Sequence, residues 1–154
     1  MRYEHLVQIN DLTRPDLPVL GRGQLWLGLL ARAERPAVFD PSIDSSRVLR
    51  RDGPQLEREL LRGSRATRET VRLAVDSSIE IGIGAGTEFE GSSLRISIEE
   101  PQPQALFLRF IYQLVGPATP VDEAEQCALR QAYYYADLET VHRIRTLIPE
   151  VVES

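Results

Sequence analysis

Five polar residues lie on faces of the chain that are otherwise apolar, and their types suit ligand binding. They are His5, Arg58, Tyr112, Tyr133 and Thr140. An inward arginine offers a two-pronged donor to a ligand carboxylate or phenolate; without a ligand it needs a carboxylate or backbone carbonyls. The tyrosines can orient a ligand through their hydroxyls while their rings form an apolar wall. For Arg58 three outcomes stay open: a ligand anchor, an ion pair with a glutamate, or a place at the rim.

Two of the candidate residues could move a proton. Histidine titrates near neutral pH, so His5 is a candidate general base, although a lone histidine on a strand is more often a hydrogen-bonded edge residue. Asp137 lies beside the inward arc of the last predicted helix, four residues after Tyr133. It is a candidate proton acceptor, and the alternative is a structural bond to a neighbouring loop or to Arg109.

The sequence offers no good metal or cofactor motif. Cys127 and His142 are about four helical turns apart, too far for one ion. Gly82, Gly84 and Gly86 are spaced Gly-x-Gly-x-Gly, but no helix follows whose N-terminus could bind a phosphate. A bend in a strand explains these glycines better. The chain has no lysine, which excludes a Schiff-base mechanism. We therefore expect no metal and no cofactor.

The composition is that of a globular protein, with 154 residues, 42% hydrophobic and 27% charged. This length suits one domain over residues 1–154. The net charge of −5 and the lack of a long arginine run argue against nucleic acid as a partner. No apolar stretch reaches the length of a membrane span, and the N-terminus lacks the apolar core of a signal peptide. We therefore expect a cytoplasmic protein without a membrane partner.

The elements that position these residues follow from hydrophobic periodicity. Alternation over residues 3–9 predicts a strand with His5 on its apolar face. An apolar stripe at three- and four-residue spacing predicts a helix over 22–34, which Pro36 ends. A short helical turn or loop follows at 38–41. Alternation then predicts six strands, antiparallel because their turns are short, at about 48–51, 56–61, 67–75, 79–83, 93–98 and 105–114.

A long amphipathic helix is predicted to close the chain, from about residue 120 to 148. Thr119 is the expected N-cap, Pro120 takes the first helical position, and Pro149 is expected to end the helix. At 1.5 Å per residue it is about 40 Å long, enough to cross the whole sheet. On a helical wheel one narrow arc faces inward, made of Leu129, Tyr133, Ala136, Thr140, Ile144 and Leu147.

The order strand, two helices, six strands and a long helix is that of the helix-grip fold. Several segments sharpen this likeness: Leu25-Trp26-x-Gly28-Leu29, Arg32-Ala33-Glu34-Arg35-Pro36, Ile98-Glu99-Glu100-Pro101, Leu108-Arg109-Phe110-x-Tyr112 and Ala136-Asp137-x-x-Thr140-Val141-x-x-Ile144-Arg145. Together they resemble the AtaL-like family of the SRPBCC superfamily, which also holds START domains, Bet v 1-like allergens and aromatase/cyclases. The resemblance implies an α+β fold: a seven-stranded antiparallel sheet wrapped around the C-terminal helix, with two short helices after the first strand.

The resemblance also implies a pocket for an apolar or aromatic small molecule between sheet and helix. The leading hypothesis is therefore binding or sequestration of a small hydrophobic molecule, aromatic or polyketide-like. The candidate ligand-binding residues are His5, Trp26, Leu29, Arg58, Leu73, Ile81, Ile96, Leu108, Phe110, Tyr112, Tyr133, Ala136, Asp137, Thr140 and Ile144.

Two alternatives stay open. One is a polyketide cyclase/dehydratase-like enzyme, in which Arg58 and Tyr112 polarise a carbonyl while His5 or Asp137 moves a proton. The other is a protein-interaction module with a filled interior and an exposed apolar patch around Phe107 and Ile111. A homodimer is possible under either hypothesis.

Overall fold

The computed structural model describes residues 1–83, 91–116 and 119–153. The predicted bend at Gly84 and Gly86 lies outside these ranges. The elements are, in chain order, β1 (Arg2–Gln8), α1 (Arg22–Glu34), the 3-10 turn η1 (Pro36–Val38), β2 (Ser45–Asp52), β3 (Gln55–Arg62), β4 (Arg65–Ala74), β5 (Ser78–Ile83), β6 (Ser93–Glu99), β7 (Phe107–Gln113) and α2 (Glu123–Glu153). The strands form one seven-stranded antiparallel sheet, in the order β1-β7-β6-β5-β4-β3-β2. The α+β fold predicted from the sequence is confirmed.

The strand register brings the predicted inward residues together. On β1 and β7, Tyr3 pairs with Tyr112 and His5 pairs with Phe110. On the other side of β7, Tyr112 pairs with Leu94. Because side chains of paired residues lie on the same face of a sheet, these aromatic and polar groups share the concave face.

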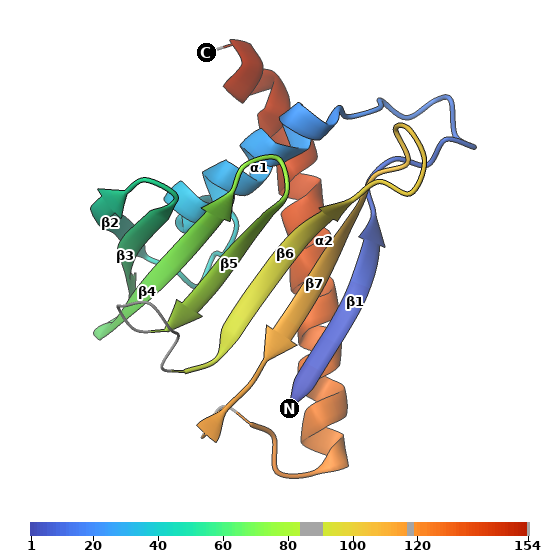
Figure 1. Ribbon diagram of the computed structural model, residues 1–154. Coiled ribbons are helices and arrows are strands. Elements are labelled where there is room, and N and C mark those ends of the chain that lie inside the picture. Colours follow the sequence, from blue (N-terminus) through green and yellow to red (C-terminus); the bar gives the residue numbers. More distant parts are fainter. Residues whose placement is uncertain (84–90, 117–118, 154) are drawn as a thin grey trace.

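Both helices lie on the same face of the sheet (Figure 1). α1 packs against β5, whereas α2 packs against α1 and β1. With 31 residues, α2 is about 46 Å long. It is therefore long enough to cross the sheet, as expected, and it packs on the β1 side while α1 occupies another part of the concave face (Figure 1).

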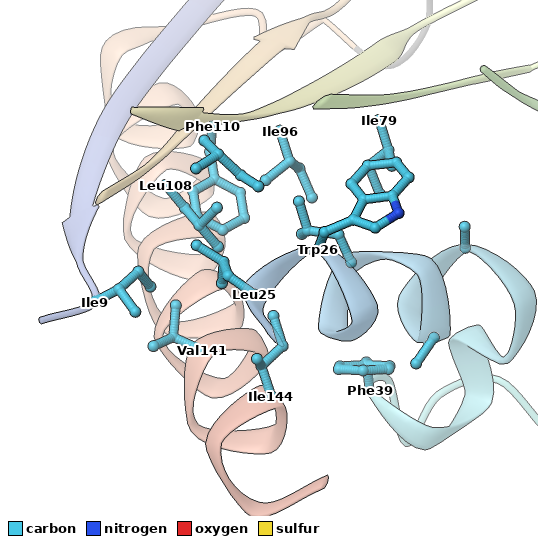
Figure 2. Packing of buried hydrophobic residues seen from close by; sticks show 14 of the residues in the cluster. Ile9, Leu25, Trp26, Phe39, Ile79, Ile96, Leu108, Phe110, Val141 and Ile144 are labelled. Atoms are coloured by element: carbon cyan, nitrogen blue, oxygen red, sulfur yellow. The ribbon is translucent and has the colours of Figure 1, made fainter. Parts of the chain in front are cut away.

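The hydrophobic core lies between the sheet, α1 and α2 (Figure 2). Leu25 and Trp26 of α1 point toward the sheet, and Val141 and Ile144 of α2 close the other side. Each fully buried side chain of this kind stabilises the fold by about 1.5–3 kcal/mol. The sheet residues that meet α1 are buried and apolar: Ile79, Ile96, Leu108 and Phe110.

Gly28 allows α1 and α2 to pack close together. A Cβ atom at this position would lie 2.5 Å from Cγ2 and 2.9 Å from Cγ1 of Ile144. Ile144 is fully buried and β-branched, so its side chain has few rotamers into which it could move. A residue larger than glycine would therefore force α1 and α2 apart.

The ends of several elements differ from the predictions. α2 begins at Glu123 rather than at residue 120, because Oδ1 of Asp122 accepts a hydrogen bond from the Glu125 amide at 2.8 Å and Asp122 acts as the N-cap. The helix continues past Pro149 to Glu153, since a proline removes one amide donor but can stay within a helix. The second predicted helix is the single turn η1, and β2 is longer than expected, with a register shift between Val48 and Arg50.

Within the residues that the structure describes, neither helix is long and apolar enough to cross a membrane.

Candidate functional site

A cavity of about 440 Å³ opens beside α1, on the part of the concave face that neither helix fills. Its walls come from β3 to β7, from the segment 36–43 after α1, and from the middle of α2. Small-molecule sites commonly have volumes of about 300–1,000 Å³. The apolar part of the wall is made of Phe39, Ile43, Leu60, Ile81, Leu94 and Leu114.

Only some of the predicted ligand-binding residues line this cavity. Those on its wall are Arg58, Ile81, Tyr112, Tyr133, Ala136 and Thr140. Others belong to the closed core instead, namely Trp26, Leu29, Leu73, Ile96, Leu108, Phe110 and Ile144. The reason is that α1 packs directly on this part of the concave face, where its own Trp26 and Leu29 meet the strand residues, while Ile144 of α2 packs against α1 at Gly28. His5 and Asp137 adjoin the wall through Tyr112. That any of these residues binds a ligand stays a prediction.

α2 is rotated relative to the helical wheel used above. Asp137, Thr140 and Val141 are buried, whereas Ala136 is largely exposed and only borders the cavity. Docking against β1 and α1 turns the Asp137 side inward. The spacing 137, 140, 141, 144 has the period of a buried helical face, so the sequence did contain the signal.

Arg58 forms the ion pair with a glutamate that the sequence left open. Its Nε and Nη2 donate to Oε1 of Glu69 at 3.0 and 2.7 Å, and its Nη1 donates to the backbone carbonyls of Arg32 and Ala33 at 3.2 and 2.8 Å. The residue is 3% exposed. Burial lowers the pKa of Arg58, and the charge of Glu69 opposes that shift. Arg58 thus ties β3 to β4 and to the end of α1, with its donors largely occupied.

Asp137 joins α2 to the sheet through two side chains. The Tyr112 hydroxyl donates to Oδ1 of Asp137 at 2.6 Å, and Nε2 of His5 lies 3.1 Å from Oδ2. That second contact lacks hydrogen-bond geometry, because Oδ2 and both His5 nitrogens are buried without a hydrogen-bond partner among the described residues. The alternative partner considered above, Arg109, pairs instead with Glu99 and Glu4.

The local environment favours the neutral forms of these groups. Burial raises the pKa of Asp137 to about 7, against the opposing effects of the Tyr112 hydrogen bond and the Arg32 charge. Burial lowers the pKa of His5. Burial, followed by the charge of Asp137, raises the pKa of Tyr112. Asp137 can therefore gain or lose a proton near neutral pH, whereas Tyr112 stays protonated.

Three tyrosines stack on one another, and two of them, Tyr112 and Tyr133, lie on the cavity wall. The rings of Tyr112 and Tyr133 are nearly parallel, with an interplanar angle of 10° and centroids 3.9 Å apart. Tyr3 stacks on both at 6.2 and 6.4 Å. Such a wall presents flat apolar surface and hydroxyl groups together, which suits an aromatic ligand.

Arg32 is the site residue that sequence reasoning missed. It projects from the last turn of α1, lines the cavity, and has a buried Nε without a hydrogen-bond partner in the described part of the chain. The sequence does indicate its inward position, because residues 25, 29 and 32 lie on the same face of a helix, and Leu25 and Leu29 are buried.

A metal site is not supported by the described residues, among which no group of three histidine, cysteine, aspartate or glutamate side chains is placed to hold an ion.

A curved antiparallel sheet holding a long C-terminal helix, with a cavity on its concave face, is a helix-grip, SRPBCC-like fold. Within that class, the chain belongs to the family of acetylaranotin biosynthesis cluster protein L (AtaL), whose match covers residues 7–150. Comparison with curated proteins finds no match.

Solved structures share this fold at low sequence identity. The di-domain ARO/CYC StfQ from the steffimycin biosynthetic pathway is 11% identical with a TM-score of 0.68, and the match covers 99% of this chain and 52% of that one. The Zhui aromatase/cyclase from Streptomyces sp. R1128 is 13% identical with a TM-score of 0.63, covering 98% and 93%. A START superfamily protein from Mycobacterium smegmatis is 14% identical with a TM-score of 0.56, covering 95% and 98%.

Proposed function

We propose that this protein binds a small hydrophobic molecule, aromatic or polyketide-like, in the cavity beside α1. The observation that carries this proposal is a cavity of about 440 Å³ whose wall combines aliphatic side chains with the stacked Tyr112 and Tyr133 rings. Apolar walls with a few placed polar groups are typical of small-molecule sites. Membership of a family named for a biosynthesis cluster protein supports a ligand from small-molecule biosynthesis.

Filling the cavity should weaken this binding. Ala136 lies on the cavity wall and is exposed, so Ala136→Trp can place an indole in the space without disturbing the core. We expect it to weaken binding of the neutral dye N-phenyl-1-naphthylamine by at least about tenfold, which is about 1.4 kcal/mol. Fluorescence titration, with native mass spectrometry as a second readout, measures the loss.

The matched control is Gln131→Trp, which adds the same indole elsewhere on α2. Position 131 is exposed and lies about 140° around the helix from position 136. It should bind the dye as the wild type does. A wild-type protein that takes up no dye, or equal binding by all three proteins, would contradict a ligand site in this cavity.

A second candidate function is that of a polyketide cyclase/dehydratase-like enzyme. The favouring observation is the buried contact of Asp137 with Tyr112, whose side chain lines the cavity. A proton leaving the carbon beside a substrate carbonyl can pass to the Tyr112 oxygen while the Tyr112 proton passes to Asp137. Arg58 is a poor carbonyl activator here, because its donors are taken by Glu69 and the α1 carbonyls.

Deuterium exchange next to the carbonyl of 1-tetralone tests this enzyme hypothesis. If the relay works, the wild type should speed exchange by about a hundredfold over buffer, and Tyr112→Phe should remove the gain. Tyr135→Phe, at an exposed position on α2, should keep it. Exchange at the buffer rate in the wild type would leave ligand binding as the function.

A further inference from the structure

The cavity contains one arginine whose charge is not balanced by the described residues. Arg58 pairs with Glu69, and Arg62 pairs with Asp40 at 3.2 Å across the rim. Glu139, also on the wall, pairs with Arg143 at 3.0 Å. Each described carboxylate on the wall is thus matched by an arginine.

Arg32 stands apart from these pairs. Among residues 1–83, 91–116 and 119–147 it forms no ion pair, and its Nε is buried without an acceptor. Arg32 as a whole is half-buried, but a buried N–H donor without an acceptor is unfavourable. The negative end of the α1 dipole, where Arg32 lies, offsets only part of this.

Asp137 does not serve as the counter-ion of Arg32. Its Oδ1 accepts the Tyr112 hydroxyl and its Oδ2 faces His5, so both oxygens are directed at other groups. Arg32 nevertheless acts electrostatically on Tyr112, Asp137 and Arg58. Arg32 and Tyr112 both line the cavity, so the charge of Arg32 faces the same space as the Tyr112 side chain.

We propose that the ligand carries an acidic oxygen group, a carboxylate, phenolate or enolate, and that Arg32 binds this group while the apolar body lies against the aliphatic wall and Tyr133. This inference rests on the proposed function, since it names the chemical class of the ligand for the same cavity. A guanidinium suits such oxygens because it donates two parallel hydrogen bonds. The arrangement puts the charged group of the ligand at Arg32 and its apolar body against the aliphatic side chains of the wall.

Two dyes with the same aromatic body isolate the acidic group. 1-Anilinonaphthalene-8-sulfonate carries an anionic sulfonate, and N-phenyl-1-naphthylamine is its neutral counterpart. Arg32→Met should weaken binding of the sulfonate dye by about 10–100-fold, as expected for a lost hydrogen bond to a charged group. Binding of the neutral dye should change by less than about threefold.

The controls distinguish a direct contact of Arg32 with the sulfonate from an effect of the net charge of the protein. Arg35→Met removes an equal charge from an exposed position three residues away and should leave the affinity ratio of the two dyes unchanged. Ala136→Trp should weaken the binding of both dyes. Arg32→Lys should recover part of the sulfonate affinity, and Arg32→Gln provides a second neutral variant if circular dichroism shows that Arg32→Met is unfolded.

The outcomes distinguish this inference from the proposed function. If both dyes still bind and Arg32→Met leaves the ratio of their affinities unchanged, the acidic-ligand inference is overturned but the proposed function is not. The same holds if Arg35→Met lowers the ratio as much as Arg32→Met does. If the wild type binds neither dye, the proposed function fails and the inference fails with it.

Discussion

Replacing Arg58 with methionine should lower the free energy of unfolding by about 3–5 kcal/mol. Arg58 is 3% exposed and bonds to Glu69 and to two carbonyls of α1. Its removal leaves the Glu69 charge and both carbonyls without their donor, and an unpaired buried charge is strongly destabilising. Urea denaturation followed by circular dichroism measures the change.

The double-mutant cycle with Glu69 shows how much of this loss comes from the pair itself. Arg58→Met combined with Glu69→Gln should lower the free energy of unfolding by less than the sum of the two single substitutions, because neither charge is then left without its partner. Arg47→Met is the matched control, since the Arg47–Glu59 pair joins the neighbouring strands β2 and β3 but the arginine is well exposed. It should lose less than about 1 kcal/mol. Equal losses for Arg47→Met and Arg58→Met would contradict the structural role of Arg58.

Replacing Asp137 with asparagine should change how stability depends on pH. Burial raises the pKa of Asp137 from 3.8 to about 7 in the folded protein. The folded state then holds more protons than the unfolded state between about pH 4 and 7, so this group's contribution to stability is lost as pH rises through that window. At about 1.4 kcal/mol per pH unit, the advantage of Asp137→Asn over wild type should grow by about 2–3 kcal/mol from pH 5 to pH 8.

The contribution of His5 to stability changes with pH in the opposite direction. Its pKa is lowered by burial, so its contribution is present above the ordinary histidine pKa and is lost as pH falls. His5 is present in both proteins, but it lies 3.1 Å from Asp137, so His5→Gln is combined with Asp137→Asn to separate the two contributions. Arg32, Tyr112 and Tyr133 also face this region and are unchanged between the two proteins.

Urea denaturation at several pH values provides the test, with Asp76→Asn at an exposed turn as control. The control should follow the wild-type pH profile. A constant difference between Asp137→Asn and wild type from pH 5 to 8 would show that Asp137 ionises in the folded protein much as it does in the unfolded chain.

The helix-capping errors show where local sequence signals compete. Thr119 and Asp122 are both good N-cap residues, and the pattern favoured Thr119 because Pro120 follows it. In the fold Asp122 caps the helix, and Glu125 accepts a hydrogen bond from the Val121 amide at 2.9 Å. Choosing between two caps depends on where the incoming chain leaves the sheet, which no local pattern encodes.

Inward and outward faces were predictable because backbone geometry sets them locally. Strand alternation put His5, Arg58 and Tyr112 on the concave face, and the structure confirms this placement. The apolar stripe of 22–34 predicted α1 to the residue, because Pro36 and the spacing of its leucines are properties of a short segment.

Only the tertiary structure shows which of the inward-facing residues line the cavity and which lie in the closed core. Leu108 and Ile81 look alike in sequence, yet α1 covers Leu108 while Ile81 lines the cavity. The pairing of Arg58 with Glu69 comes from the register of β3 and β4, in which the two residues lie opposite each other. The contact of Asp137 with Tyr112 and the unpaired state of Arg32 among described residues depend on how α1 and α2 dock. That docking joins segments about a hundred residues apart and is set by the packing of whole faces. Periodicity indicates which face of a segment is buried, but not which distant segment that face packs against.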